Sequence, residues 1–295
     1  MEDMDTQKPL ITVYVPAYNH EKYVLQCLES IGQQTLKNFE WIVVDDCSKD
    51  STPDILKREQ GRFGYKLILH EKNKGLSATL NEILELTTTK YITGCASDDY
   101  WLPNKLELQL DFMEQHPEYA VSFGKSIDVD VEGNVLGEHI NTSYRSGFIF
   151  SDIITMKFHP PVNQMFQTRI LKDIGGYPSG IVAEDFYMNC LLSSKYQIGY
   201  IPEVLSYYRV APNESKRDPY SLYKSHEETI LQYKESELFK KAYQLQCKRT
   251  FLGIAPFTKY KLLALKYLFK VGWANVDLAF GKKCISYLFR WWKSC

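Results

Sequence analysis

The sequence predicts an α/β protein with a parallel sheet covered by helices on both faces, followed by a helical C-terminal region. Short runs rich in branched apolar residues alternate with 10–15-residue helical patterns in the first half of the chain. This alternation stops after Ser126, and from Ser221 onward the pattern is helical. We therefore divide the 295 residues into regions 1–220 and 221–295, and the first region into 9–126 and 127–220.

Residues 9–126 contain five expected strands and four expected helices. Ser51 is a suitable N-cap for the second helix, because a serine hydroxyl can accept from a free N–H of the first turn. Pro53 suits the first turn, because proline has no N–H to leave unpaired there. The expected strands are Leu10–Val15, Phe39–Asp45, Lys66–His70, Tyr91–Cys95 and Tyr119–Ser126. The expected helices are Lys22–Gln33, Thr52–Arg62, Leu76–Leu86 and Asn104–His116.

The second half of this region is less regular. Asp128–Val135 predicts a hairpin with Glu132-Gly-Asn at its tip, and residues 141–183 show no clear element. A helix is expected from Glu184 to Ser194, and Gln197–Val210 is expected to form two short strands.

The composition is that of a globular chain in a reducing compartment. Seven scattered cysteines without a C-x-x-C pair argue against disulfides or a zinc site. The acidic N-terminus has no apolar core, so we expect no signal peptide, and no apolar run is long enough for a transmembrane helix. We expect a cytoplasmic location. The net charge of −1 hides an asymmetry, since the chain carries −8 up to residue 250 and +7 beyond it.

Polar residues follow three of the expected strands. Pro16–Asn19, Asp45–Ser51 and Ser97–Asp99 each come directly after a strand, and ligands of such sheets bind at the carboxyl ends of the strands. Adjacent carboxylates such as Asp98 and Asp99 repel each other unless a cation lies between them, which favours a divalent metal and a phosphate-bearing ligand. The alternative for this pair is a solvated turn before the helix at Asn104.

Other candidates are weaker when taken singly. Asp46 is not needed as a helix cap, which favours a ligand contact, and Tyr18 could stack on a nucleobase or simply pack. Glu184 and Asp185 lie at the start of an expected helix, where a carboxylate often only interacts favourably with the helix dipole. The functional interpretation is that this pair supplies a general base. His159 is the histidine expected to face a substrate.

Taken as a set, the motifs between residues 9 and 215 resemble those of family-2 glycosyltransferases with the GT-A fold, a group that includes bacterial O-antigen, capsule and exopolysaccharide enzymes. They occur in the order and at the spacing typical of that family. The matching segments are Val15-Pro-Ala-Tyr-Asn, Ser30-Ile-Gly-Gln-Gln-Thr, Val43-Val-Asp-Asp-Cys-Ser-Lys-Asp-Ser-Thr, Asn73-Lys-Gly-Leu-Ser, Ser97-Asp-Asp, Trp101-Leu-Pro-Asn-Lys, Gly175-Gly-Tyr, Glu184-Asp185 and Tyr207-Tyr-Arg.

The resemblance implies a Rossmann-like mixed sheet and a role for each matching residue. Asp46 would contact the base of a nucleotide-sugar, which the resemblance implies is a UDP-sugar, in a pocket lined by Pro16, Ala17, Tyr18, Asn19 and Ser48. Asp98 would contact the ribose or sugar, and Asp99, with Asp98, would bind Mn²⁺ or Mg²⁺ on the diphosphate. Asp185 would be the general base of an inverting displacement, with Trp101, His159 and Glu184 on the acceptor side. The acceptor would be a glycan or a polyprenyl-diphosphate-linked sugar, and no nucleic-acid partner is expected.

The chain departs from the family pattern at a few positions. Ala96 stands where the acidic run often begins, Ala78-Thr-Leu-Asn replaces a segment that often holds an arginine, and Ala211 replaces a histidine common after Tyr-Arg. These departures leave open a catalytically impaired domain that binds nucleotide or scaffolds a complex. A nucleotidyltransferase and an NAD-dependent oxidoreductase are disfavoured, because no glycine-rich phosphate loop follows a strand.

The basic tail predicts amphipathic helices that contact an anionic membrane from the cytoplasmic side. Lys259, Lys266 and Lys270 share one helical face, and a second basic face opposes an apolar surface. The second face comprises Lys282, Lys283, Arg290 and Lys293, opposite Leu288 and Trp292. The alternative is a helical extension that packs on the protein, with its lysines merely solvated.

Overall fold

The computed structural model describes residues 8–138, 144–210 and 218–293. Two compact units can be distinguished within the chain. The first comprises Met1–Ile149, Pro160–Gly180 and Leu192–Ala211, and the second comprises Phe150–His159, Ile181–Leu191 and Pro212–Cys295. Each unit is described separately below.

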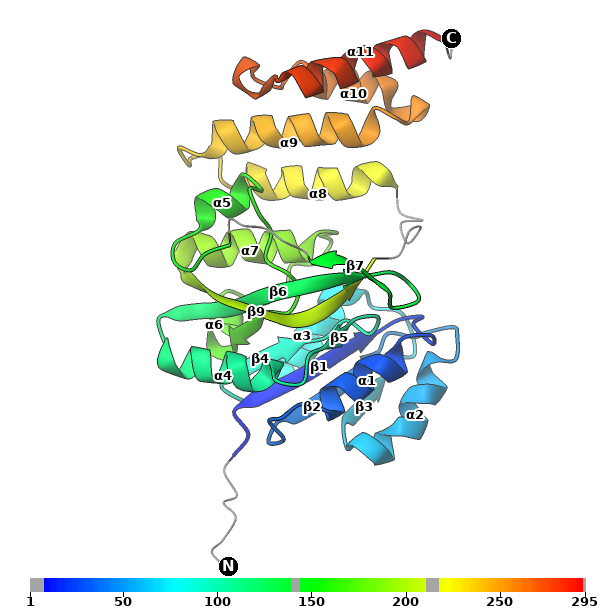
Figure 1. Ribbon diagram of the computed structural model, residues 1–295, viewed down its shortest axis with the longest axis vertical. Coiled ribbons are helices and arrows are strands. Elements are labelled where there is room, and N and C mark those ends of the chain that lie inside the picture. The colour runs from blue at the N-terminus through cyan, green and yellow to red at the C-terminus, as the bar shows by residue number, and fades with distance from the viewer. Residues whose placement is uncertain (1–7, 139–143, 211–217, 294–295) are drawn as a thin grey trace, which may run out of the picture. The chain divides into compact units, whose positions relative to one another are not determined.

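The first unit is built on a mixed sheet that, in the described ranges, has nine strands (Figure 1). Its order is β3-β2-β1-β4-β8-β6-β9-β5, and β7 pairs with β6. The pairs β1–β2, β1–β4, β2–β3 and β6–β9 are parallel, whereas β8 runs antiparallel to both β4 and β6. The strands are β1 Ile11–Ala17, β2 Glu40–Asp45, β3 Lys66–Leu69, β4 Tyr91–Gly94, β5 Tyr100–Trp101, β6 Tyr119–Val129, β7 Val135–Glu138, β8 Met165–Gln167 and β9 Gln197–Arg209.

Helices cover this sheet and complete a core of branched and aromatic side chains. Val13 and Val15 of β1 are fully buried together with Leu28 of α1 and Leu106 of α4. The end of α2 is set by Gly64, whose positive φ of 75° gives the left-handed C-cap that glycine adopts without strain. The helices are α1 Val24–Gly32, α2 Thr52–Phe63, α3 Leu76–Leu86, α4 Lys105–Gln115, α6 Thr168–Asp173 and the last part of α7 Glu184–Lys195.

The α/β class and the mixed sheet implied by the resemblance are confirmed, as are the alternating elements of the first half and the hairpin. The alternation alone indicated a parallel sheet, but β5 and β8 run antiparallel to their neighbours. Two further expectations were wrong. Residues 141–183 contain α5 Phe150–Ile154, β8 and α6, and β8 is a central strand of only three residues, too short to show an alternating pattern. Gln197–Arg209 is one strand rather than two, because the pairing with β6 shifts register around Pro202 and so accommodates the missing N–H.

The second unit is mainly helical. It contains α5, the start of α7, α8 Pro219–Leu231, α9 Phe239–Ile254, α10 Lys261–Leu268 and α11 Leu278–Lys293. Figure 1 shows α8, α9 and then α10 with α11 as successive layers. Phe251, Tyr267 and Trp291 meet in a shared core, where the Trp291 indole donates to the carbonyl of Ala255 at 3.0 Å. In the described ranges, every helix is too short or too polar to cross a bilayer.

Lys105 is an unusual element of the first core, because its ammonium group is fully buried. Its Nζ donates to Thr93 Oγ1 at 2.8 Å and to Gln109 Oε1 at 2.6 Å, and lies 3.8 Å from the centroid of the Trp101 ring. Burial lowers the pKa of Lys105 to about 7, since a buried charge loses its hydration. The charged form of Lys105 is therefore less stable in the folded protein than in the unfolded chain, which reduces the free energy of unfolding near neutral pH.

We expect the substitution Lys105→Met to reduce the pH dependence of stability. Between about pH 7 and 10.5 the unfolded chain holds a proton on Lys105 that the folded chain releases, so the free energy of unfolding rises with pH by up to about 1.4 kcal/mol per pH unit. Methionine removes this contribution. Urea unfolding at several pH values in that window would measure it, with the exposed Lys66→Met as the control. Parallel pH profiles for wild type and Lys105→Met would contradict the assignment.

Candidate active site

The loops after β1 and β2 are tied to each other. The Asn19 N–H donates to Ser48 Oγ at 2.9 Å, and Asn19 Oδ1 accepts from the Lys49 N–H at 2.7 Å. Asn19 has a positive φ of 55°, a conformation that asparagine tolerates better than most residues. Pro16 and Ala17 form the end of β1, and Tyr18 beyond them is 44% exposed. The Tyr18 ring is thus available to stack on a flat ligand.

Ser48 holds the second of these loops in shape. Its N–H donates to Asp45 Oδ1 at 2.9 Å, and its hydroxyl donates to the other oxygen of the same carboxylate. Cys47 between them has a positive φ of 64°, so this turn departs from ordinary backbone conformations. The Ser48 side chain, which we expected at a ligand, links Asp45 to Asn19.

Asp46 is buried and accepts hydrogen bonds on both carboxylate oxygens. His70 Nδ1 lies 2.8 Å and the Lys74 N–H 2.7 Å from Oδ1, and the Gly75 N–H lies 2.8 Å from Oδ2. Burial favours the neutral carboxyl, but the hydrogen bonds from His70 and the two backbone groups outweigh it, so the pKa of Asp46 is lowered. Asp46 therefore fixes the segment leading into α3.

Asp98 and Asp99 lie in the turn between β4 and β5, and the structure separates their roles. Asp99 is buried, and its Oδ1 accepts from the backbone N–H of Arg209 at 2.8 Å. The Asp98 side chain is 16% exposed, with Oδ1 3.8 Å from His20 Nδ1. Asp98 is thus the carboxylate that a ligand can reach more easily, whereas Asp99 is anchored to β9.

Arg209 is the residue that holds this turn in place. It is buried at the end of β9, and its Nε donates to the Asp98 carbonyl at 2.9 Å. Its other nitrogens donate to the carbonyls of Asp130 and Val131 and to Gln26 Oε1. The guanidinium carbon lies 4.5 Å from the Tyr23 ring centroid, within the range of a cation–π contact.

His20 brings the first loop to the same turn. Its backbone N–H donates to Thr52 Oγ1 at 2.9 Å, and its Nδ1 lies 2.8 Å from Ser97 Oγ. The ends of β1, β2 and β4 are therefore connected through side chains at one edge of the sheet. This is the convergence that the sequence predicted for the three segments.

The donor set at this edge fits a hard divalent cation. Carboxylate oxygens are the ligands that Mg²⁺ and Mn²⁺ take in proteins, and Mg²⁺ often completes its shell with phosphate oxygens and water. In the described ranges, no three histidine, cysteine, aspartate or glutamate side chains are grouped so as to hold a metal by themselves. Asp98 and Asp99 could therefore hold such an ion only together with ligand oxygens.

In the second unit, Asp185 lies in the first turn of α7, beside a histidine. Asp185 Oδ1 accepts from the Phe186 N–H at 2.7 Å, and its Oδ2 lies 3.7 Å from His159 Nε2. The Asp185 side chain is 43% exposed, so an incoming hydroxyl could reach it. His226 contacts the Phe186 ring on the buried side, and burial lowers the pKa of His226 to about 4.

The C-terminal helices hold the segments around Asp185. Arg249 of α9 donates to the carbonyls of Thr155 and Met156, at 3.1 and 2.6 Å, just before His159. Ser225 Oγ of α8 accepts from the Ala183 N–H at 3.0 Å, just before Glu184. The region expected to be an extension thus takes part in positioning the candidate base.

The candidates on the acceptor side differ in accessibility. His159 and Glu184 are partly exposed. Trp101 is only 4% exposed and packs under Lys105 in the core, so it is not among the residues that we propose for acceptor binding. Ala211 lies outside the described residues.

Sequence reasoning missed several residues that shape this site. Arg209 was noted only as part of Tyr207-Tyr-Arg, and His20, His70 and Arg249 were not singled out. For Arg209 a signal existed, since an arginine that ends a mostly apolar strand needs buried acceptors. The histidines and Arg249 gave no comparable signal in a single sequence.

Comparisons with known proteins agree with this fold. The model of the family "Glycosyl transferase family 2" matches residues 12–175. An uncharacterized glycosyltransferase of Methanocaldococcus jannaschii is 30% identical over 226 residues, covering 73% of this chain and 74% of that protein. A putative teichuronic acid biosynthesis glycosyltransferase of Bacillus subtilis is 38% identical over 111 residues, or 37% of this chain and 44% of that protein.

Two solved structures share the fold at low identity. TarS 1–349 of S. aureus in complex with UDP-GlcNAc has a TM-score of 0.61 at 20% identity, covering 88% of each chain. A mannosyltransferase from Pyrobaculum calidifontis in complex with GDP-Man and Mn²⁺ has a TM-score of 0.64 at 16% identity, covering 95% of this chain and 80% of that one. Together with the family match, these findings show that this chain is a GT-A glycosyltransferase and belongs to glycosyl transferase family 2.

Proposed function

We propose that this enzyme transfers a hexosyl or N-acetylhexosaminyl group from a UDP-sugar to a hydroxyl of a glycan or lipid-linked acceptor, with inversion. The observation that carries the proposal is the edge of the sheet where Arg209 and His20 hold Asp98 beside the loops of β1 and β2. Structures of similar fold hold UDP-GlcNAc or GDP-Man, which supports a nucleotide-sugar donor for this chain.

On the donor side, the exposed Tyr18 ring would stack on the base. Pro16, Ala17, Asn19 and Ser48 would form the wall of the pocket through the loops that they join. Asp46 would contribute a base contact and, by its bonds to Lys74 and Gly75, keep the neighbouring segment in place.

The cation would be held by the Asp98 and Asp99 carboxylates, with Asp98 the more accessible of the two. When bound, Mn²⁺ or Mg²⁺ would neutralise charge on the diphosphate that leaves. Asp99 keeps the turn on β9 through the Arg209 N–H, so it contributes to the position of the Asp98 side chain as well.

Asp185 would act as the general base. Its exposed carboxylate would take the proton of the acceptor hydroxyl while that oxygen forms a bond to the anomeric carbon and the bond from this carbon to the diphosphate breaks. A single displacement inverts the anomeric centre and needs no covalent enzyme intermediate. His159 and Glu184 would contact the acceptor beside Asp185.

We propose that the acceptor belongs to a bacterial surface polysaccharide such as an O-antigen or capsule, and that it is carried on a membrane lipid. The match to a teichuronic acid enzyme supports a surface polymer. The basic tail supports a position on the inner face of the cell membrane. The alternative is an impaired domain that binds nucleotide-sugar without transfer, and it differs from the first proposal only in turnover.

Donor binding should appear as a metal-dependent rise in melting temperature. A ligand at 100 times its Kd adds about 2.7 kcal/mol to the free energy of unfolding. We expect UDP-sugars with Mn²⁺ to raise the melting temperature, and Asp98→Asn to remove the part that depends on Mn²⁺. Asp54→Asn, whose side chain is 83% exposed on α2, is the control. The proposal fails if no nucleotide-sugar shifts the melting temperature with or without metal.

Loss of the base should separate transfer from donor binding. Asp185→Asn keeps the shape of the side chain but cannot accept the proton, so we expect kcat to fall by about 10²–10⁴ while the donor-induced thermal shift persists. Asp173→Asn, a 57% exposed carboxylate on α6, is the control and should keep wild-type turnover. Unchanged turnover in Asp185→Asn would remove Asp185 from this role.

A further inference from the structure

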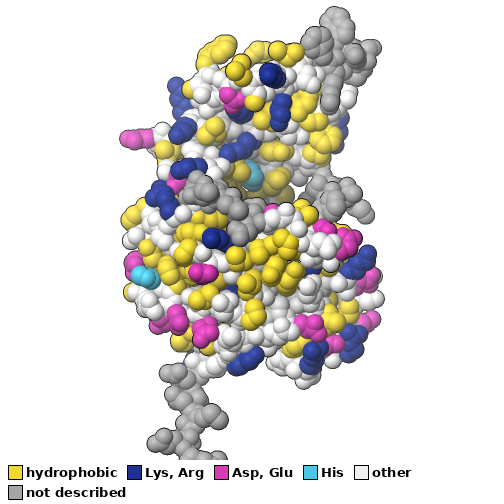
Figure 2. Space-filling model, in the orientation of Figure 1, with side chains coloured by type: hydrophobic (Ala, Val, Ile, Leu, Met, Phe, Trp, Pro, Cys, Tyr) yellow, Lys and Arg dark blue, Asp and Glu magenta, His cyan; other side chains and the backbone are white. Residues whose placement is uncertain are grey.

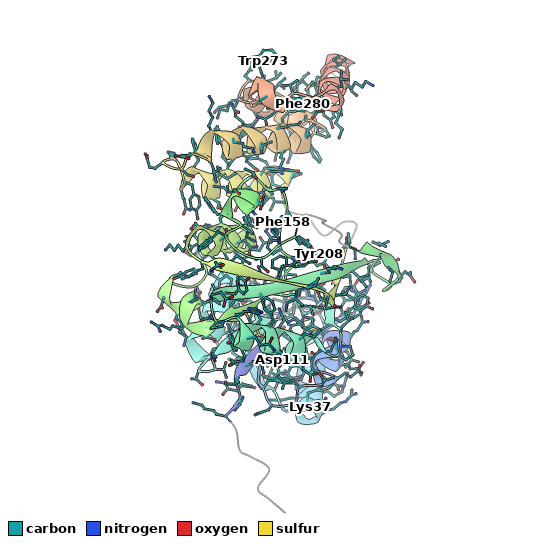
Figure 3. All side chains as sticks on the ribbon, turned by 60° about the vertical axis from the view of Figure 1, so that its left-hand side comes forward. Lys37, Asp111, Phe158, Tyr208, Trp273 and Phe280 are labelled. Atoms are coloured by element: carbon teal, nitrogen blue, oxygen red, sulfur yellow. The ribbon has the colours of Figure 1, made fainter. Side chains whose placement is uncertain are left out.

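The C-terminal helices expose large apolar side chains to an unusual degree. Leu262, Phe269, Trp273 and Leu278 are 82%, 86%, 91% and 86% exposed, all within 17 residues of the chain. Single exposed apolar residues are common, whereas a large exposed apolar patch is typical of an interaction surface. Figure 3 shows Trp273 at the outer end of this unit, whereas Phe280 lies among the helices.

These side chains alternate with lysines along two helices. On α10, Leu262, Lys266 and the adjacent Phe269 are spaced i, i+4, i+7, which places them on one face. On α11, Leu278, Lys282 and the exposed Ile285 repeat the same spacing. The 3-10 turn Trp273–Asn275 lies between the two helices in sequence. We use the name open face for the following seven residues: Leu262, Lys266, Phe269, Trp273, Leu278, Lys282 and Ile285.

The open face is distinct from the face that packs. Ala264 and Tyr267 of α10 and Phe280 of α11 are buried in the core of this unit. The open face therefore is not required to hold the helices together. Figure 2 shows basic and hydrophobic side chains interspersed over this part of the molecule.

Not all lysines of the basic face expected from the sequence are available to a ligand. Lys259 pairs with Asp218 at 2.9 Å, and Lys270 donates to the Tyr243 hydroxyl at 2.8 Å. Lys266, Lys282 and Lys283 are exposed and make no ion pair with any residue that the structure describes. The side chains of Leu288, Arg290, Trp292 and Lys293 lie outside those described. Among the described lysines from Phe251 onward, those free of an ion pair and exposed thus lie within or beside the open face.

We propose that the open face inserts into an anionic lipid bilayer. Leu262, Phe269, Trp273 and Leu278 would enter the boundary between headgroups and acyl chains, as apolar faces of interfacial helices do. Lys266, Lys282 and Lys283 would meet lipid phosphates. The inference rests on the membrane contact proposed above and names the residues that make it.

Charge favours a bilayer over a second copy of the chain as the occupant. A symmetric dimer through this face would bring lysine rows together, because each copy presents the same patch. The one acid from Phe251 onward is Asp277, and it already pairs with Lys248 at 2.7 Å. An anionic membrane supplies the opposite charge along with an apolar layer, and the open face carries both features.

Vesicle binding by the full chain tests the proposal, with vesicles of phosphatidylcholine alone or with phosphatidylglycerol. We expect co-sedimentation only with the anionic vesicles. The combined change Leu262→Ser, Phe269→Ser, Trp273→Ser and Leu278→Ser should weaken it at least about 100-fold. Lys266→Glu with Lys282→Glu should weaken it at least about tenfold. Because all six side chains lie on the open face, these variants should fold.

Matched controls separate this face from general charge and hydrophobicity. Lys240→Glu with Lys241→Glu makes the same charge change at exposed positions of α9. Leu136→Ser with Phe148→Ser removes apolar residues that are 60% and 68% exposed in the first unit. Both control pairs should bind anionic vesicles like wild type.

Several outcomes would overturn the proposal. The open-face variants could bind anionic vesicles as well as wild type, or the control variants could lose binding to the same extent. A third such outcome is that the wild-type chain forms a dimer without lipid and the serine variant is monomeric. Trp273 fluorescence gives an independent readout, since brominated lipids should quench it and Trp273→Phe should lose that quenching. Asp185→Asn should bind vesicles fully while failing in transfer, so failure of the enzymatic proposal remains distinguishable from failure of this one.

Discussion

The candidate site on the sheet depends on one buried arginine, Arg209. Arg209 is enclosed by the first unit, and a buried charge is tolerated only when its donors all find acceptors. Its acceptors come from three places: the Asp98 turn, the turn after β6, and Gln26 of α1. The same residue's N–H holds Asp99. The two acidic residues thus take their positions from β9, the last strand in chain order, so the candidate site forms only together with this part of the sheet.

Local patterns were sufficient for much of the fold. Helix α3 has the expected bounds, Leu76–Leu86, because its apolar spacing and the preceding glycine are both encoded within a few residues. The short strand β8 could not be found in this way, since three residues carry no period and its place between β4 and β6 is decided by distant partners. Gln197–Val210 was expected to form two strands, yet a register shift against β6 around Pro202 keeps β9 as one strand. Prediction therefore failed where pairing partners lie far apart in the sequence.

The same distinction applies to the site. Strand ends could be located from the sequence, and the loops of β1, β2 and β4 do converge. The role of a carboxylate within such a loop could not be predicted from the residues next to it in the sequence. Asp46 is bound by donors 24 to 29 residues away, so a residue that appeared unused by its neighbours is a structural anchor as well as a ligand candidate. Trp101 shows the converse, because the buried Lys105 over its ring is a packing partner that the motif did not reveal.

The two tasks that we propose for the C-terminal helices, holding the candidate base and contacting a membrane, would use different residues. Ser225 and Arg249 on α8 and α9 bond to backbone groups close to Glu184 and His159, so these helices are part of what positions the candidate base. The open face on α10 and α11 uses none of those contacts. A truncation after residue 250 would remove both Phe251 and Ile254 from the core of α9, and loss of activity or of membrane binding would then have no single cause. Point substitutions on the open face leave that core intact. They can therefore test the proposed membrane contact separately from the position of the candidate base.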